Sequence, residues 1–319
     1  MTHLVWILGR GGLLGSAIGQ TLQSVSPLQE WRGPVEHFSW RNPEELSVQL
    51  RLSVQALKET LADTPGSQWR IVWAAGNGTI RSLPEELAEE TAAWKILLTF
   101  LSTNLRDTPG RIFFASSSAV YGTNPDQLTE YTPPSPTAPY GEAKVMQEAL
   151  LRNSITDMPL ASGIIGRIST LYGEAQNVEK PQGLISHLSR SLLLRTPVHV
   201  YVPLDTIRDY LYAADAAEMI VQCLLCDLPS HERCTVKLIA SEERTTIAVL
   251  IGLFRQMMKQ PSRIIATTTP TITSFPRCTQ LHSVVLPHIR PTRRTNLRDG
   301  IQRVHRFHLE RLERGLLRS

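Results

Sequence analysis

Apolar runs alternate with amphipathic segments along the first 170 residues of the chain. The runs are short and continuous, as in strands buried on both faces, and they fall at residues 4–8, 35–38, 71–73, 112–115 and 164–168. Between them, apolar residues that recur every three or four positions predict helices that begin near residues 13, 42, 84 and 139. Such repeated β–α units predict an α/β fold, a doubly wound parallel sheet with helices on both faces.

The pattern loosens after residue 170, where we expect a smaller α/β region. Helices are predicted over 184–194, 213–226 and 245–258, and a Thr- and Pro-rich loop over 267–292. A last helix is predicted with Ile301, Val304, His308 and Leu312 on one face. Short strands are predicted near 198–202, 207–212 and 235–239. We therefore expect two domains: residues 1–170, together with 203–228, around the large sheet, and residues 171–319 mainly in a second, C-terminal domain.

Composition and charge exclude several classes of protein. Of the 319 residues, 42% are hydrophobic and 19% charged, which is enough apolar material for a large core and excludes wholesale disorder. The net charge of +4 comes from residues 290–319, which carry +6, so the body is not basic and we expect no nucleic-acid partner. We see no signal-like leader and no membrane span, so we expect a cytoplasmic protein that binds no membrane.

Four cysteines are too few for a disulfide framework in a chain of this length. Cys223, Cys226, His231 and Cys234 have a spacing that suggests a metal site. The first two lie in a predicted apolar helix, however, and buried thiols behave as small hydrophobic groups. A closed zinc site needs four converging ligands, so we expect no metal here.

A glycine-rich loop follows the first predicted strand and opens the first helix. It reads Gly9-Arg10-Gly11-Gly12-Leu13-Leu14-Gly15, a G-x-x-G-x-x-G sequence. Glycine permits a tight turn and lets backbone N–H groups approach a pyrophosphate at the positive end of the helix. The alternative is an ordinary β–α turn, but the strand before and the helix after favour a dinucleotide site.

Two further segments carry side chains suited to proton transfer. Tyr140 and Lys144 are spaced i, i+4 at the start of a predicted helix, which places phenol and ammonium on one face. A nearby cation favours the phenolate form of a tyrosine and makes it a usable acid or base near neutrality. The segment Ala115-Ser116-Ser117-Ser118 ends the fourth predicted strand, at the edge where open α/β sheets bind ligands.

In this order, the three segments resemble the extended short-chain dehydrogenases/reductases, also called the NAD-dependent epimerase/dehydratase family. Further matches are Trp73-Ala74-Ala75-Gly76 after the third strand, the segment 167–173 after the fifth, and Ile207-Arg208-Asp209-Tyr210-Leu211-Tyr212-Ala213-Ala214-Asp215. The resemblance covers about residues 1–255 and fades beyond them. It implies a Rossmann-type sheet domain that binds the dinucleotide and a smaller C-terminal α/β domain that binds the substrate.

The resemblance implies a catalytic set of Ser117, Tyr140 and Lys144. Tyr140 would be the acid/base in a hydride transfer to or from a sugar carbon, and Lys144 would bind the nicotinamide ribose. The expected cofactor contacts are Gly9, Arg10, Gly12, Leu13, Leu14, Gly15, Ser39, Arg41, Ala74, Ala75, Gly76, Ala115, Ser116, Tyr140 and Lys144. The expected substrate contacts are Ser117, Ser118, Thr170, Arg208 and Arg290. The implied substrate is a nucleotide sugar and the implied assembly a homodimer.

Departures from the family pattern narrow the set of reactions that we expect of this chain. Nucleotide-sugar dehydratases carry Asp-Glu after the catalytic hydroxyl residue, where this chain has Ser118 and Ala119, so dehydration is disfavoured. GDP-fucose synthases have a cysteine at the position of Ala119, so their double epimerisation is doubtful here. Many nucleotide-sugar enzymes have, where Thr170 stands, an Asn that helps hold the sugar diphosphate, so the substrate class stays open here.

The second predicted strand bears on the choice of cofactor. NAD enzymes usually end this strand with Asp or Glu, which binds the ribose 2′-hydroxyl. Here the strand is followed by Ser39 and Arg41, which together with Arg10 suit a 2′-phosphate, and Glu36 is placed within the strand. NADP is therefore favoured over NAD.

The leading hypothesis is an NAD(P)-dependent oxidoreductase or epimerase that acts on a nucleotide-activated sugar in polysaccharide or related biosynthesis. One alternative is a reductase of a carbonyl compound that is not a sugar nucleotide. A second is a non-catalytic dinucleotide-binding regulator, which would have no need of Ser117, Tyr140 and Lys144. A nucleic-acid module is the weakest hypothesis, because it depends on the tail charge alone.

Overall fold

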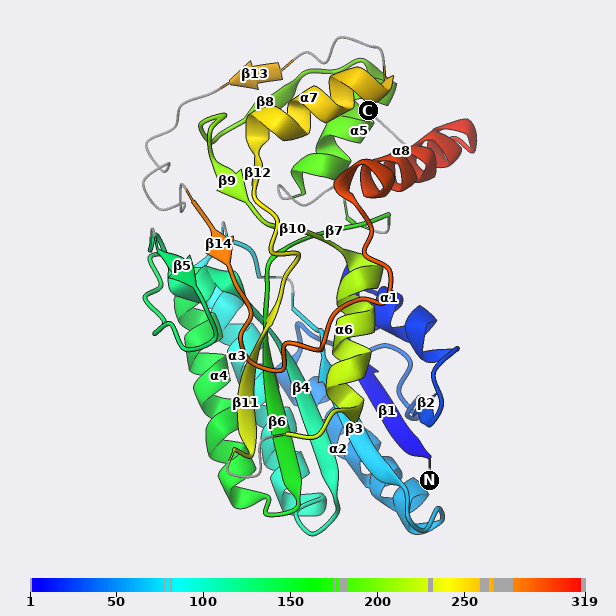
Figure 1. Ribbon diagram of the computed structural model, residues 1–319. Helices are drawn as coiled ribbons and strands as arrows, with labels where there is room; N and C mark the ends of the chain where they lie inside the picture. The colour runs from blue at the N-terminus through cyan, green and yellow to red at the C-terminus, as the bar shows by residue number, and fades with distance from the viewer. Residues whose placement is uncertain are drawn as a thin grey trace.

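The computed structural model describes residues 2–76, 78–80, 82–124, 126–174, 176–177, 183–228, 232–258, 264–266 and 278–316. Its centre is a six-stranded, all-parallel sheet with the order β11-β6-β4-β3-β1-β2 (Figure 1). The strands are β1 (His3–Leu8), β2 (Leu28–Glu30), β3 (Gln68–Trp73), β4 (Gly110–Ser117), β6 (Ala161–Ile168) and β11 (Cys234–Ile239). The predicted α/β fold with a doubly wound parallel sheet is confirmed.

Helices cover both faces of this sheet because successive strand residues point to opposite sides. In β1, Leu4, Trp6 and Leu8 pack on one face, where α2 (Pro43–Ala62), α3 (Pro84–Asn104) and α4 (Pro139–Asp157) lie. Val5 and Ile7 pack on the other, beneath α1 (Leu13–Leu22) and α6 (Ala213–Leu225). The predicted helix starts are confirmed, and Asn42 caps α2 by accepting the Glu45 N–H at 3.2 Å.

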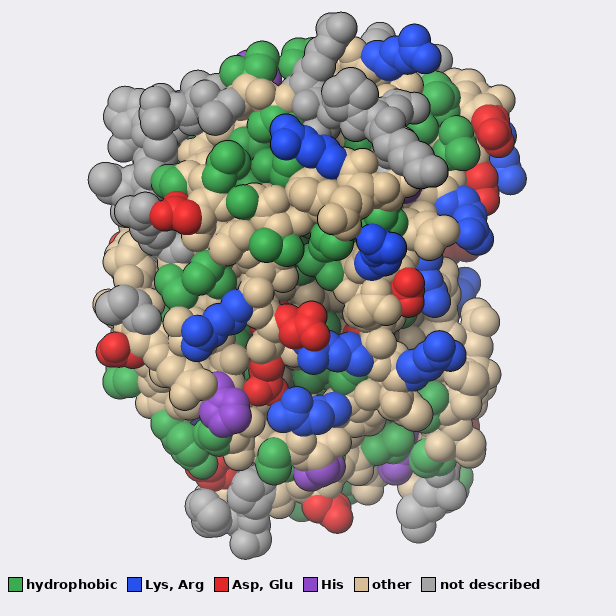
Figure 2. All heavy atoms as spheres, turned by 45° about the horizontal axis from the view of Figure 1, so that its top comes forward, with side chains coloured by type: hydrophobic (Ala, Val, Ile, Leu, Met, Phe, Trp, Pro, Cys, Tyr) green, Lys and Arg blue, Asp and Glu red, His purple; other side chains and the backbone are tan. Residues whose placement is uncertain are grey.

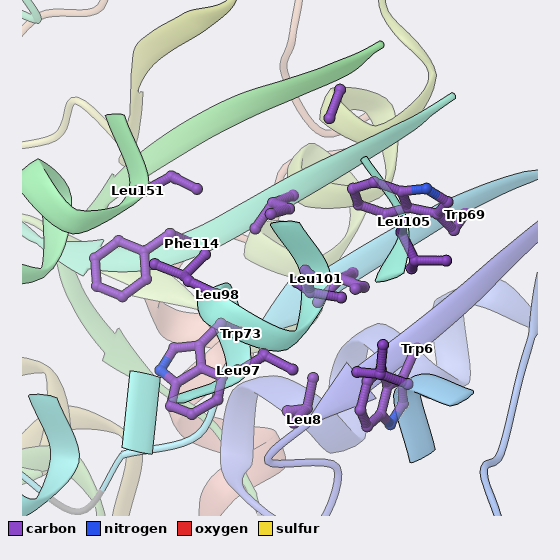
Figure 3. Packing of buried hydrophobic residues seen from close by; sticks show 14 of the residues in the cluster. Trp6, Leu8, Trp69, Trp73, Leu97, Leu98, Leu101, Leu105, Phe114 and Leu151 are labelled. Atoms are coloured by element: carbon purple, nitrogen blue, oxygen red, sulfur yellow. The ribbon is translucent and has the colours of Figure 1, made fainter. Parts of the chain in front are cut away.

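An aromatic row fills the core beneath α2, α3 and α4. Figure 3 shows Trp6, Trp73 and Phe114 lining this layer, with leucines of α3 among them. Trp94 connects the row to the helix that carries Tyr140: its ring stacks on Phe114 at 5.1 Å, and its indole N–H donates to the backbone oxygen of Gln147 in α4 at 3.1 Å. The core therefore supports α4 directly.

The position of the second strand is a correction. The strand expected over 35–38 is absent from the described structure; β2 lies earlier, at Leu28–Glu30, where it pairs with β1. Phe38 instead packs its ring against Trp6 at 6.2 Å and Trp40 at 5.4 Å. Tertiary packing of an aromatic side chain thus outweighs the local strand preference of this segment.

Two arginines from the sheet cap the end of α6. Arg70 of β3 donates to the Leu224 carbonyl at 2.9 Å, and Arg111 of β4 donates to the carbonyls of Cys223 and Cys226 at 2.8 and 2.6 Å. These carbonyls end the helix, where the macrodipole is negative. Burial and the Arg111 charge lower the pKa of Arg70 to about 10.

A second group of elements lies beyond the C-terminal ends of the strands (Figure 1). Its core contains apolar residues of α5 (Leu184–Leu194), α7 (Ile247–Met258) and α8 (Leu297–Glu313). The short strands pair as β7 (Thr170–Tyr172) with β10 (Tyr210–Tyr212), β9 (Ile207–Arg208) with β12 (Thr245–Thr246), β8 (Val198–Val200) with β13 (Ile264–Ala266), and β5 (Gln127–Leu128) with β14 (Gln280–Leu281). The predicted helices α5, α6 and α7 are confirmed; residues 267–277 of the expected loop lie outside the described residues.

The surface carries both signs of charge. Figure 2 shows basic and acidic side chains intermixed on one face, and the described side chains form no extended basic area there. Two surface ion pairs join Arg290 to Glu242 and Arg294 to Glu243, and His282 Nδ1 lies 3.1 Å from Glu242 Oε2. Within the described ranges, none of the helices combines the length and apolar character that crossing a bilayer requires.

Candidate active site

The glycine loop between β1 and α1 is shaped by two close approaches of backbone. Gly9 has a φ of +88°, and a Cβ there would lie 2.5 Å from the backbone of Ala74 and Ala75, which follow β3. A Cβ at Gly15 would lie 2.2 Å from the Gly9 carbonyl oxygen. Both glycines are required for the loop to pack between α1 and the end of β3.

The middle of the same loop is open and suits an anion. A Cβ at Gly11 would meet nothing within 4 Å, and one at Gly12 only the Gly9 carbonyl oxygen at 3.4 Å. Gly12 caps α1 without a side-chain hydrogen bond, and the first turn contains no acidic residue. The N–H groups at Leu13 and Leu14 therefore begin a helix whose positive end is uncapped, which fits the pyrophosphate of a dinucleotide.

The ends of β3 and β4 lie side by side next to this loop. Trp73 pairs with Phe114, and the Ala74 N–H donates to the Leu8 carbonyl at 2.9 Å, so Ala74, Ala75 and Gly76 continue from the sheet edge beside Gly9. Ala115 is half-buried on β4. These residues lie where a parallel sheet binds its ligands.

The serines at the end of β4 have different environments. The Ser116 hydroxyl is buried and donates to Glu148 Oε1 at 2.6 Å, so its side chain is turned into the protein. Ser117 is half-buried, and its Oγ accepts the Ala119 N–H at 3.2 Å at the start of the 3₁₀ helix Ser118–Tyr121. Ser118 begins that turn and is half-buried.

Tyr140 and Lys144 lie in the first two turns of α4, which begins at Pro139. Lys144 Nζ lies 5.7 Å from the centre of the Tyr140 ring and 5.3 Å from that of Phe114. It donates to Gln147 Oε1 at 3.0 Å and to Glu90 Oε1 at 2.8 Å. Burial lowers the pKa of Lys144, but Tyr140 and Glu90 outweigh it and raise the pKa above its ordinary value.

Glu148, one turn further along α4, holds a second buried ion pair. Its two oxygens accept from Arg167 of β6 at 3.0 and 2.8 Å, a bidentate pair in which the side chains are only 4% and 5% exposed. The Arg167 guanidinium lies 4.9 Å from the centre of the Tyr121 ring. Neither Glu90 nor Glu148 was expected from sequence, since each meets a partner that is remote in the chain.

The end of β2 carries a carboxylate, Glu30, which the sequence analysis also missed. Glu30 Oε1 accepts from Arg10 Nε at 2.8 Å and lies 3.4 Å from Arg32 Nε. The Arg10 side chain passes over Gly19 of α1, where a Cβ would lie 2.2 Å from its Nε. The position of Glu30, 15 residues after the glycine loop, is the signal that the sequence offers, but a second strand over 35–38 places Ser39 and Arg41, not Glu30, at the strand end.

Ser39 and Arg41 lie nine or more residues beyond the end of β2. The backbone N–H and the hydroxyl of Ser39 are both hydrogen-bonded to the Gln49 amide, at 2.8 and 3.1 Å. Arg41 is exposed beside the start of α2. Of the three residues, Arg10 binds the carboxylate that ends the second strand, whereas Ser39 binds Gln49.

Three of the expected substrate contacts, Thr170, Arg208 and Arg290, lie on separate elements. Thr170 is exposed at the start of β7, and its N–H donates to the Asp209 carbonyl at 3.0 Å. Arg208 is half-buried in β9, and burial lowers its pKa. Arg290 is exposed and bound to Glu242 at 3.1 Å.

Cys223 is buried in the apolar core, whereas Cys226 Sγ donates to the Cys223 carbonyl at 3.5 Å. Burial raises the pKa of the thiols of Cys223 and Cys226, and that of Cys234 to about 11. His231 lies outside the described residues, and the described residues contain no group of three or more His, Cys, Asp or Glu side chains arranged to hold a metal.

Two curated proteins are similar in sequence to part of this chain. The dTDP-4-dehydro-6-deoxyglucose reductase of Escherichia coli is 31% identical over 140 residues, 44% of this chain and 43% of the relative. The uncharacterized UDP-glucose epimerase YtcB of Bacillus subtilis (strain 168) is 30% identical over 113 residues, 35% of this chain and 34% of the relative. The chain thus matches less than half the length of each of these curated relatives.

Solved structures match nearly the whole chain. MoeE5 in complex with UDP-glucuronic acid and NAD has a TM-score of 0.75 at 19% identity, covering 97% of this chain and 99% of that one. The UDP-glucose 4-epimerase of Thermus thermophilus in complex with NAD has a TM-score of 0.74 at 18% identity, covering 96% and 99%. These similarities show a shared fold. A family model also matches residues 5–230, most of the chain, and the protein therefore belongs to the NAD dependent epimerase/dehydratase family of enzymes.

Proposed function

We propose that this protein is an NAD(P)-dependent oxidoreductase or epimerase of a nucleotide-activated sugar, with Ser117, Tyr140 and Lys144 as its catalytic set. The observation that carries the proposal is the placement of Tyr140 and Lys144 at the start of α4, with Phe114 of β4 beneath the ammonium. An open glycine loop lies at the same edge of the sheet. A phenol with an adjacent cation suits proton transfer at a sugar hydroxyl.

The dinucleotide site would be formed by the glycine loop, Ala74 to Gly76 and Lys144. A nicotinamide cofactor, when bound, accepts or donates the hydride of a sugar carbon. Tyr140 would take the proton of the hydroxyl on that carbon as it becomes a carbonyl, and return it on reduction. Ser117 would donate a hydrogen bond to the same oxygen, and Lys144 would stabilise the phenolate.

The cofactor within NAD(P) is inferred from the end of β2. The sequence favours NADP through Ser39 and Arg41, but Glu30 occupies the position from which an acidic residue binds a ribose 2′-hydroxyl. Its negative charge would also repel a 2′-phosphate. We therefore infer that NAD binds more tightly than NADP, with Glu30 as the ribose partner.

The substrate side is inferred from the relatives and from chemistry. The names of several relatives include dTDP- or UDP-linked sugars, and Arg208 is suited to a bidentate contact with a diphosphate. We propose that residues 1–170 and 203–228 hold the dinucleotide and that the rest mainly holds the substrate. A homodimer is part of the same proposal and is measurable by light scattering.

The proposal is tested by incubating the purified protein with UDP-glucose, UDP-glucuronic acid or dTDP-4-dehydro-6-deoxyglucose, with NAD(H) or NADP(H), and separating the sugar nucleotides. An epimer, or a reduced product formed with loss of NAD(P)H absorbance, supports it, and Tyr140→Phe is the matched control. Turnover of simple carbonyl compounds alone would favour the reductase alternative. Tight dinucleotide binding without turnover of any of these compounds would favour a regulator.

A further inference from the structure

Glu90 places a carboxylate in the centre of the candidate site, on α3. Its Oε1 accepts from Lys144 Nζ at 2.8 Å, and its Oε2 accepts the Gly78 N–H at 3.2 Å. A Cβ at Gly76 would lie 2.9 Å from both carboxylate oxygens. Glu90 is therefore held between α4 and the loop after β3, the loop that contains the expected cofactor contacts Ala74 to Gly76.

Tyr140 shares this small space. A Cβ at Gly78 would lie 3.1 Å from Glu90 Oε2 and 3.4 Å from the edge of the Tyr140 ring. The Lys144 side chain is 5% exposed and that of Glu90 is 9% exposed, so water screens their charges little. Each of these charges acts on the phenol at short range.

Lys144 belongs to one of two buried ion pairs that involve α4, and the charges of the two pairs balance. Glu90 comes from α3, Lys144 and Glu148 from α4, and Arg167 from β6, two acids against two bases. Lys144 by itself would favour the phenolate of Tyr140, whereas the carboxylate bound to it opposes this effect. The i, i+4 spacing of Tyr140 and Lys144 therefore describes only part of the electrostatics of the phenol.

We propose that Glu90 is a positioning residue that holds the Lys144 ammonium and sets the proton affinity of Tyr140. The proposal rests on the function proposed above, in which Tyr140 exchanges a proton with a sugar hydroxyl. Glu90 itself neither gains nor loses a proton in that exchange. Neutralising Glu90 leaves the Lys144 charge uncompensated, so Tyr140 should lose its proton at a lower pH.

Glu90→Gln tests this inference, because the amide has the size of the carboxylate and retains an acceptor oxygen. Tyrosinate absorbance is titrated with pH in the wild type and in Glu90→Gln, and again in each of these proteins with Tyr140→Phe added. The difference between the two curves of a pair is the titration of Tyr140. Burial raises the pKa of Tyr210 and Tyr212 to about 12, so these tyrosines ionise late. We expect the midpoint of the Tyr140 titration to fall by about one pH unit in Glu90→Gln. The acidic limb of the pH profile of kcat/KM should also shift to lower pH. The exposed neighbour Glu89, changed to Gln, should move neither.

An unchanged midpoint in folded Glu90→Gln would overturn the inference, as would an equal shift in Glu89→Gln. If the glutamine variant does not fold, Glu90→Asp and Glu90→Asn form a second pair that differs only in charge, and the midpoint should be higher in the aspartate variant. The titration needs no turnover. A midpoint shift without turnover of nucleotide sugars would therefore support the role of Glu90 and count against the proposed function alone.

Discussion

Glu30 is the residue through which we expect the chain to distinguish NADH from NADPH. Its Oε1 lies 2.8 Å from Arg10 Nε and 3.4 Å from Arg32 Nε at the end of β2. Changing Glu30 to Gln removes one negative charge and preserves the size of the side chain. Arg10 and Arg32 then lose their ion pairs with this carboxylate. NADH should lose a charged acceptor for its ribose, and NADPH should lose a source of repulsion.

The expected magnitudes follow from the contacts. A hydrogen bond to a charged group contributes about 1.5–3 kcal/mol, so NADH should bind the Glu30→Gln variant roughly 10–100-fold more weakly. A 2′-phosphate carries a charge of about −1.5 to −2. In the Glu30→Gln variant it would interact with the guanidinium groups of Arg10 and Arg32, whose side chains are 33% and 74% exposed. Solvent screening limits that gain to about 1 kcal/mol. The ratio of the two dissociation constants should therefore change by roughly 10²-fold.

Fluorescence titration of one protein preparation with NADH and NADPH measures this ratio, and defects in folding cancel. The wild type should prefer NADH, and the NADPH gain in Glu30→Gln should shrink as salt rises. Glu36→Gln, an exposed change of the same type six residues later, should leave the ratio unchanged. The reasoning is wrong if wild type prefers NADPH, or if Arg41→Ala weakens NADPH alone, which would restore the role assigned to Arg41 from sequence.

Three further predictions concern catalysis, cofactor binding and stability. Tyr140→Phe should reduce turnover by about 10²–10⁴-fold with little change in dinucleotide affinity by calorimetry; near wild-type activity would remove Tyr140 from the mechanism. Gly12→Val should fold, because a Cβ there meets only the Gly9 oxygen at 3.4 Å, and should weaken dinucleotide binding in the fluorescence titration; unchanged affinity would make the loop purely structural. His308 is buried on α8, neither ring nitrogen has a hydrogen-bond partner among the described residues, and burial lowers its pKa from 6.5 to about 4. The unfolded state therefore binds the proton more readily than the folded state. Urea unfolding should show that the free energy of unfolding falls by about 2 kcal/mol between pH 7.5 and pH 5. His308→Leu should remove this contribution, and an identical pH dependence in both proteins would contradict the prediction.

The parts of the site that were predictable depend on short stretches of sequence. The glycine loop, the Asn42 cap and the Tyr140–Lys144 pair each act within about seven residues, so spacing alone determines which groups meet. The parallel sheet followed in the same way from alternating strand and helix patterns. The sheet is confirmed, and the structure brings Tyr140 and Lys144 together, because local geometry and tertiary packing favour the same arrangement.

The second strand could not be located in this way. Leu28–Glu30 has three residues, two of them polar, and forms a strand only through its pairing with β1. The segment 35–38 is the more apolar of the two, but Phe38 uses its ring to extend the row that runs through Trp6 and Trp40. The expected position of this strand is the reason that Ser39 and Arg41, and with them NADP, are favoured from sequence, whereas the observed strand ends at Glu30.

The charges beside Tyr140 also include a residue that is remote in the sequence. Spacing along α4 correctly brings Lys144 to Tyr140, yet the charge that the phenol experiences also depends on Glu90, 54 residues earlier in the chain than Lys144. Glu90 reaches Lys144 only because α3 and α4 pack together on one face of the sheet, with Trp94 of α3 bonded to the backbone of α4 at Gln147. A sequence motif can thus identify the group that we propose moves the proton, while the fold determines which charged groups lie beside it.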